Sequence, residues 1–246
     1  MNIDATTWQV AGILFIATIG RSTFGFGEAL LAVPLLALLI PVKVAVAVAA
    51  LISTMVALII VAQDWKHIEH RSAGLLLAST VFGIPLGLLL VKEVAEPVVK
   101  GVLALVILAF AVFSLVNRTS AELKDDRLAW AFGFAAGILG GAYAINGPPL
   151  VVYGALRRWS PTRFRATLQG YFLPGSALVV VGYWVGGLLN LSVLRYFLVS
   201  LPAVLVAILV GTAINRRLDA QRFRASLNVV LVIVGIALLA QAVYRG

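Results

Sequence analysis

Two stretches decide the fold of this chain: STFGFGEALLAVPLL at Ser22–Leu36 and LGGAYAINGPPLVV at Leu139–Val152. Each interrupts an apolar segment with glycines, and one lies in each half of the sequence. Glycine permits backbone conformations that other residues rarely adopt, so we expect a helix to stop and restart at each stretch. Helices that break at corresponding positions of two halves often form the binding site of a membrane transporter. The pattern therefore favours a transport function.

The composition is typical of a polytopic membrane protein. Of 246 residues, 62% are hydrophobic, and the mean hydropathy is +1.05. A helix needs about 20 apolar residues to cross a bilayer, and six apolar runs are long enough. These predicted spans are Val42–Ala62, Ala73–Val91, Val98–Val116, Ala166–Gly187, Tyr196–Ile214 and Ala225–Tyr244. Four shorter runs form two pairs, each joined at a glycine stretch: Gln9–Gly20 with Ala29–Ile40, and Leu128–Leu139 with Pro149–Leu156.

The order short, short, long, long, long occurs twice along the chain. We therefore expect an all-α polytopic membrane protein with a single transport domain over residues 1–246. Repeat 1 covers 1–117, a cytoplasmic linker covers 118–127, and repeat 2 covers 128–246. Each repeat would be a broken helical hairpin followed by three transmembrane helices, and this odd number of spans gives the repeats inverted topology. The halves align weakly, with Gly87 on Gly211.

Basic residues favour hairpins over single kinked spans. With hairpins, the loops at 64–71, 117–127, 157–165 and 215–224 share one side and carry 13 Lys and Arg, against 5 on the other side. With kinked spans, the best division is 11 against 7, and the chain has eight spans in parallel repeats. The positive-inside rule prefers the hairpins and places the basic loops in the cytoplasm and both termini outside. Both topologies stay open at this point.

Other function classes lack their motifs. The net charge of +9 lies between apolar runs and not along an exposed face, so no nucleic-acid partner is expected. The chain has no cysteine, and His67 and His70 share one polar loop, which favours a solvated loop over a metal site. Gly175-Ser176 lacks the flanking pattern of a nucleophile elbow, and no nucleotide-binding motif is present. We expect no enzyme activity, no metal and no cofactor.

Arg21 and Glu28 are the two charged residues that this topology places inside the membrane. A charge at that depth costs at least ~2.5 kcal/mol unless it is paired or hydrated, so such residues are functional candidates. Arg21 would hold an oxyanion through its planar fork of donors. Glu28 would either balance Arg21 or carry a coupling proton. The alternative is an ion pair that only joins the two helices of the hairpin.

The second glycine stretch carries no charge, but it ends at a helix start. Such a start aims free N–H groups and a positive dipole end at the site. Asn146 and Tyr143 would add neutral donors, and Gln169 either faces the cavity or bonds a neighbouring helix. The predicted substrate-binding residues are thus Arg21, Gly25, Gly27, Tyr143, Asn146, Gly147 and Gln169. Alternatively, the glycines serve only packing, as in the GxxxG spacings Gly133–Gly137 and Gly182–Gly186.

Several of these motifs resemble one known family. Gly25-Phe-Gly27-Glu-Ala-Leu-Leu-Ala-Val-Pro34 resembles the first glycine-rich helix start of the TauE/SafE sulfite exporter family, also called the toluenesulfonate uptake permease family. Gly137-Ile-Leu-Gly140-Gly141, followed by Asn146-Gly147-Pro148-Pro149, is similar to its second-repeat counterpart. The segments at 157–169 and 211–224 also resemble the family, so the resemblance covers essentially the whole chain. One departure is Glu28, where the family tends to have glycine or another small residue.

The resemblance implies a multi-pass carrier of sulfite, sulfonates or related anions in the bacterial inner membrane, driven by the proton gradient. Together with the broken helices it predicts a secondary active transporter that works by alternating access. Its partners would be a small anion, protons and the lipid bilayer. An anion channel and a carrier of small carboxylates are the alternatives, although a channel would need a continuous polar pore. A homodimer is possible, because the GxxxG spacings can pack within one chain or between two.

Overall fold

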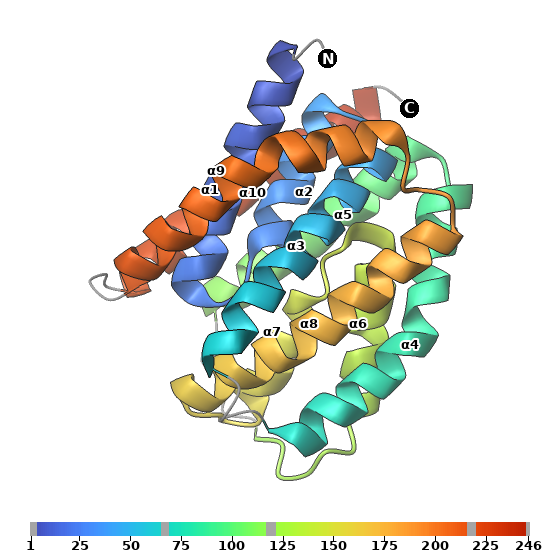
Figure 1. The fold of residues 1–246 in the computed structure, drawn as a ribbon. Helices are drawn as coiled ribbons and strands as arrows, with labels where there is room; N and C mark the ends of the chain where they lie inside the picture. The colour runs from blue at the N-terminus through green and yellow to red at the C-terminus, as the bar shows by residue number, and fades with distance from the viewer. Residues whose placement is uncertain (1–3, 65–68, 117–121, 216–219, 245–246) are drawn as a thin grey trace.

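The structure is a computed structural model of the 246-residue chain, and it describes residues 4–64, 69–116, 122–215 and 220–244. Within these residues the chain forms ten α-helices and no strand (Figure 1). The helices are α1 (Ala5–Phe24), α2 (Glu28–Leu39), α3 (Val42–Asp64), α4 (His70–Glu93), α5 (Glu96–Val116), α6 (Ala129–Tyr143), α7 (Gly147–Leu156), α8 (Pro161–Val185), α9 (Leu191–Asn215) and α10 (Ala220–Tyr244).

Five of these helices, α3, α4, α5, α8 and α9, are long and apolar enough to cross a membrane by length and composition. Helices α2, α6 and α7 are shorter apolar helices, as predicted for three of the four short runs. The predicted sixth span, Ala225–Tyr244, begins among residues whose side chains lie outside the description, and its described apolar part is Leu231–Val243. The prediction of an all-α polytopic membrane protein is confirmed.

Several helices extend beyond the predicted apolar runs, and the extension of α1 is the one that matters for the site. The short run at Gln9–Gly20 belongs to the 20-residue helix α1, which continues through Arg21 to Phe24. The predicted run stops at Gly20 because the uninterrupted apolar sequence ends where Arg21 begins. In the fold, Arg21 lies in the last turn of α1, where the negative end of the helix dipole favours a cation, and it has partners on two other helices.

The two halves of the chain interlock. Helix α1 packs on α9 as α6 packs on α4, while α3 packs on α8 and α5 on α10. If the two halves are equivalent, α1 corresponds to α6 and so on up to α5 and α10. Under this correspondence the α1–α9 contact becomes the α6–α4 contact, and the α3–α8 and α5–α10 contacts map onto themselves. In Figure 1, α1 begins and α2 ends toward the top, which fits the hairpin topology, whereas α6 begins toward the bottom. The inverted relation of the repeats stays a prediction, and this arrangement favours it.

Glycines let α4 and α6 touch backbone to backbone. A Cβ added at Gly83 would lie only 2.9 Å from the Cα of Gly137, and a Cβ at Gly137 would lie 2.9 Å from the Cα of Gly83. Real Cβ atoms essentially never come that close to a neighbour. The same crowding occurs at Gly87, Gly133 and Gly141. We call these five residues the glycine seam; it uses the Gly133–Gly137 spacing for packing within one chain.

The equivalent contact in the other half also needs a glycine. Gly211 on α9 is the residue that aligns with Gly87, and a Cβ there would lie 2.8 Å from the Ile19 carbonyl oxygen on α1. Gly182 and Gly186 face Ile84 and Leu88 of α4, so this second GxxxG spacing is also used inside the chain.

Candidate functional site

The first glycine stretch forms a tight turn between α1 and α2. Gly25 and Gly27 have φ angles of 85° and 97°, in the left-handed region where a side chain would be strained. Gly25 N–H donates to the Arg21 carbonyl oxygen and closes α1, while Leu31 N–H donates to the Gly27 carbonyl oxygen and opens α2. The amides of α2 before Leu31 therefore have no helical partner, and the positive end of the α2 dipole lies at this turn.

The second stretch forms a corresponding turn between α6 and α7. Ala144 takes the left-handed conformation with φ 54°, and its N–H donates to the Gly140 carbonyl oxygen. Helix α7 begins at Gly147, but its next two residues, Pro148 and Pro149, carry no N–H. This helix start offers a dipole but few donors. The two helix starts are therefore unequal, and α2 supplies most of the amides.

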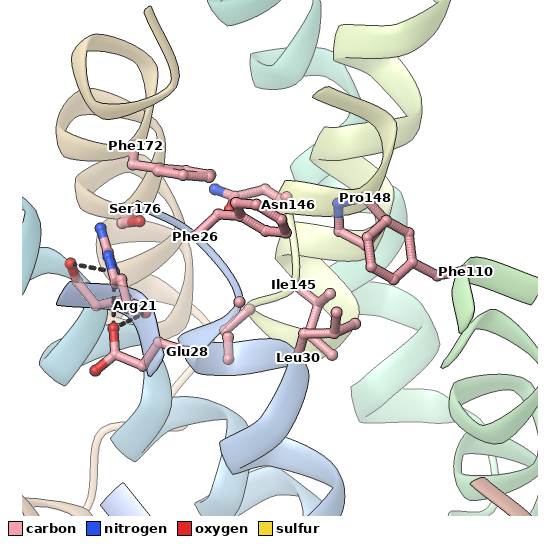
Figure 2. A pocket seen from close by; sticks show the side chains of 15 residues that line it. Arg21, Phe26, Glu28, Leu30, Phe110, Ile145, Asn146, Pro148, Phe172 and Ser176 are labelled. Atoms are coloured by element: carbon pink, nitrogen blue, oxygen red, sulfur yellow. Dashed lines mark hydrogen bonds and ion pairs between the residues drawn. The ribbon is translucent and has the colours of Figure 1, made fainter. Parts of the chain in front are cut away.

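Both turns line one pocket (Figure 2). Residues 26–30 come from the first turn and 144–148 from the second, so the two stretches meet across the halves of the chain. Helices α1, α3, α5 and α8 complete the lining with Arg21, Ser53, Phe110, Phe172 and Ser176. Figure 2 shows Arg21, Glu28 and Ser176 toward one end, and Leu30, Phe110 and Pro148 toward the other.

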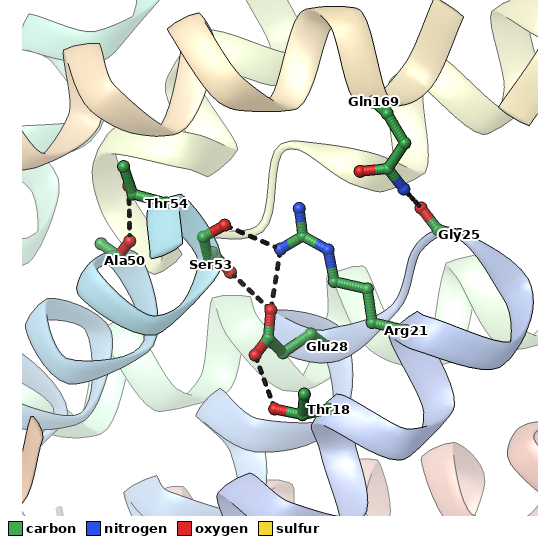
Figure 3. A network of polar contacts seen from close by, with 8 residues as sticks. All are labelled: Thr18, Arg21, Gly25, Glu28, Ala50, Ser53, Thr54 and Gln169. Carbon is green, nitrogen blue, oxygen red and sulfur yellow. Dashed lines mark hydrogen bonds and ion pairs between the residues drawn. The ribbon is translucent and has the colours of Figure 1, made fainter. Parts of the chain in front are cut away.

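A buried ion pair forms the polar end of the pocket (Figure 3). Arg21 is 3% exposed and Glu28 1%. Arg21 Nη1 donates to Glu28 Oε2 at 2.7 Å and to the Ser53 carbonyl oxygen at 3.1 Å. The Glu28 carboxylate also accepts from Thr18 Oγ1 at 2.9 Å and from Ser53 Oγ at 3.2 Å. The two charges thus cancel, and the carboxylate is well supplied with donors, as a buried charge requires.

One edge of the Arg21 guanidinium has no partner among the residues that the structure describes. Within the described residues, its Nε and Nη2 atoms are buried and make no hydrogen bond. Buried donors are normally satisfied, so this edge calls for a ligand. Its two parallel N–H groups match the spacing of two oxygens of a carboxylate, sulfonate or phosphate. The Phe172 ring centroid lies 5.3 Å from Arg21 Cζ, within cation–π distance.

Five of the eight predicted site residues line this pocket: Arg21, Gly27, Glu28, Asn146 and Gly147. The other three join helices beside it. Gln169 Nε2 on α8 donates to the Gly25 carbonyl oxygen (Figure 3), and Tyr143 Oη donates to the Val99 carbonyl oxygen on α5 at 2.9 Å. Direct contact of Gly25, Tyr143 or Gln169 with a substrate stays a prediction.

Sequence reasoning missed the lining residues that lie outside the two glycine stretches, apart from Arg21. Ser53 looks like an ordinary small polar residue of a span, which usually bonds its own helix. Phe110, Phe172 and Ser176 lie in long apolar runs, where pocket-facing and lipid-facing residues have the same character. As for metals, no group of three or more His, Asp or Glu could hold an ion among the described residues. His67 lies outside the described residues.

A second polar cluster surrounds Asp126 and holds the end of α7 in place. Asp126, before α6, accepts from Ser72 Oγ at 2.8 Å and from Tyr153 Oη at 2.6 Å, and Arg157 Nη2 lies 3.4 Å away. Burial acts to raise the pKa of Asp126, but the hydrogen bonds from Tyr153 and Ser72, with Arg157 and Arg71 nearby, outweigh it and lower the pKa below its ordinary value. The cluster ties the far end of α7 to α4 and to the loop before α6.

The model of the sulfite exporter TauE/SafE family matches residues 10–238. The chain belongs to this family. The matched region contains both glycine stretches and every residue that lines the pocket. TauE/SafE membership implies transport of a sulfite or sulfonate anion across a membrane, and it implies a transporter and not an enzyme. No curated protein and no solved structure matches the chain. The TauE/SafE resemblance inferred from the motifs is confirmed.

Proposed function

We propose that this protein is a secondary active transporter of small organosulfur oxyanions, sulfite or sulfonates, in the bacterial inner membrane. It works by alternating access and is coupled to protons. The observation that carries the proposal is the buried Nε–Nη2 edge of Arg21, which has no partner in the part of the chain that the structure describes and lies at a pocket lined by both glycine turns. Membership of the TauE/SafE family supports the class of anion.

The pocket offers distinct contacts to the two ends of such an anion. Two oxygens of the oxyanion accept from the free edge of Arg21, and the amides of Ala29 and Leu30 at the start of α2 add donors and a favourable dipole. The aromatic walls, Phe110 and Phe172, suit the carbon part of a sulfonate. The charge that attracts the anion is thus confined to one end of the site.

Glu28 weakens the attraction between the Arg21 guanidinium and the cargo, because its negative charge offsets the charge of Arg21. Because Arg21 already bonds the Glu28 carboxylate at 2.7 Å, its positive charge is largely compensated when the site is empty. A proton on Glu28 removes that compensation and leaves Arg21 to the incoming anion. Proton and anion therefore favour each other's binding, which is the basis of coupling.

The arrangement of the hairpins supports alternating access. The α1–α2 pair enters from the top of Figure 1, whereas α6 begins toward the bottom, and both turns meet at the pocket. Each hairpin therefore covers the site from one side. Displacing one hairpin while the other stays closed would expose the pocket to one side only.

The test is uptake of labelled sulfite and methanesulfonate into proteoliposomes. Arg21→Ala alone would leave Glu28 as an unpaired buried charge, so we pair it with Glu28→Gln, which leaves no buried charge uncompensated. We expect the double variant to fold and to lose uptake, whereas Arg127→Ala, at an exposed loop residue, keeps the parental rate. Uptake by the double variant at the parental rate would refute the site. Competition by unlabelled acetate tests the carboxylate alternative, and single-channel currents would indicate a channel.

A further inference from the structure

We infer that the site moves one proton with one monovalent anion, so that transport is electroneutral and responds to the pH gradient but not to the membrane potential. This inference rests on the proposed function and specifies its stoichiometry and the charge of its cargo. It follows from the charges around the pocket, from the division of labour between the nitrogens of Arg21, and from the hydroxyl groups beside Glu28.

The charge of the site depends on few groups. Helix α2 packs on α1, α3, α5 and α10. Of the described side chains, Arg21 on α1 is the charged group within ion-pair distance of Glu28. At the start of α3, Lys43 bonds the Lys92 carbonyl oxygen instead.

The other neighbouring elements add no charge at the pocket. At the start of α5, Glu96 and Lys100 pair with each other at 3.1 Å. The described side chains of α10, from Leu231 onward, carry no charge. The pocket residues of the second half, 144–148 with Phe172 and Ser176, are also neutral. Within the described residues, Arg21, Glu28 and the cargo therefore set the charge of the site.

Arg21 separates its two tasks. Nη1 donates to Glu28 and to the Ser53 carbonyl oxygen, while Nε and Nη2 have no hydrogen-bond partner among the described residues, so a bound anion does not have to displace Glu28. The empty site, with Arg21 positive and Glu28 negative, is neutral. A monovalent anion would make it negative, and one proton on the carboxylate restores neutrality. In that step a Glu28 oxygen forms an O–H bond while one O–H bond of a hydronium ion breaks and leaves a water molecule.

The surroundings of Glu28 accept either protonation state. Thr18 Oγ1 and Ser53 Oγ both donate to the carboxylate. A hydroxyl can also accept a hydrogen bond, so either one can rotate and accept from the protonated carboxyl group. Both oxygens of the Glu28 carboxyl group therefore keep hydrogen-bond partners in either state.

Neutrality decides which forms can change conformation. Carrying a net charge through a low-dielectric interior is strongly disfavoured, whereas a compensated set of charges crosses without that penalty. The empty site and the site loaded with both proton and monovalent anion are neutral. The forms with only the proton or only the anion are charged and stay in place. A divalent anion with one proton is also charged, which selects hydrogensulfite or a sulfonate over fully ionised sulfite.

The test uses the wild-type protein in proteoliposomes with labelled methanesulfonate. This sulfonate stays monovalent over the assay range, so any effect of pH belongs to the protein. With the potential clamped at zero, a gradient of one pH unit should accumulate the anion about tenfold. With no pH gradient, a potential of about 100 mV should accumulate none, whereas one uncompensated charge would give roughly 50-fold.

Glu28→Gln separates exchange from net transport. A glutamine fixes the neutral state, so the loaded site stays neutral and exchange of internal for external methanesulfonate should persist. The empty site then bears the charge of Arg21, and net uptake should be lost. The matched control is Glu122→Gln, which neutralises a Glu paired with Arg158 at 3.2 Å in an exposed loop and should behave as the parent. If Glu28→Gln does not fold, the gradient experiments on the wild type decide alone.

The outcomes separate this inference from the proposed function. Uptake driven by the potential, or accumulation near 100-fold per pH unit, would overturn the one-proton electroneutral scheme while exchange still supports a transporter. Absence of any uptake or exchange of methanesulfonate and sulfite would overturn the proposed function itself.

Discussion

Replacing Arg21 by lysine should weaken cargo binding and leave the ion pair in place. A lysine ammonium keeps the positive charge opposite Glu28, but it lacks the planar edge formed by Nε and Nη2. A hydrogen bond to a charged group contributes about 1.5–3 kcal/mol. Losing one of the two hydrogen bonds between Arg21 and the anion should therefore raise the Kd for methanesulfonate roughly 10- to 150-fold. Because the buried pair is kept, thermal stability should change little.

Titration calorimetry on the purified protein measures this change in Kd, and thermal unfolding measures stability in the same samples. The control is Arg127→Lys, since the Arg127 side chain is 90% exposed and pairs with Asp125 in a loop. A Kd for Arg21→Lys within about threefold of the parental value corresponds to a change in binding free energy of less than ~1 kcal/mol. Such a result would show that the guanidinium edge does not hold the anion. A large loss of stability would show that lysine does not preserve the ion pair.

Three further changes probe the packing around the site. Gly137→Leu should destabilise the protein by about 3 kcal/mol, since the side chain enters the glycine seam, while Gly12→Leu, in open space, should not alter the melting temperature. Asp126→Asn should lower the free energy of unfolding by about 1–2 kcal/mol at neutral pH, whereas Asp125→Asn should lower it far less. The pKa of Asp126 is lower in the folded protein than in the unfolded chain, where it is about 4, so its carboxylate stabilises the fold above that pH. This stabilisation is lost as the pH falls through the lowered pKa of the folded state. The difference in stability between the parent and Asp126→Asn should therefore vanish in acid. Gln169→Leu should lower kcat more than it raises KM, because Gln169 holds the first turn without lining the pocket; a pure rise in KM would contradict this.

The sequence predicts the parts of the site that contrast with their surroundings. Arg21 and Glu28 stand out because charges are rare among apolar residues, and the glycine stretches stand out because they interrupt long apolar runs. The structure brings these features together at one pocket. The weak alignment of Gly87 with Gly211 also has a physical basis, because each residue lets a helix of one half approach a helix of the other.

The rest of the site depends on contacts that a single sequence does not specify. Arg21 lies within α1 and donates to the carbonyl oxygen of Ser53, 32 residues later, a contact between helices that the local sequence does not reveal. Phe110 and Phe172 line the pocket from long apolar runs, and lipid and pocket select the same residue types there. The prolines after Gly147 do show in the sequence that α7 has few free amides, but their effect matters only once the helix start is placed at the pocket.

The glycine seam bears on how this molecule can be divided. In the seam, α4 of the N-terminal half packs backbone to backbone against α6 of the C-terminal half, so neither half is an independent rigid body. A rocking motion must then split the protein along a plane between helix groups that each draw on both halves. Fragments 1–117 and 128–246 should accordingly be degraded when produced alone and should reassemble when produced together in the same cell.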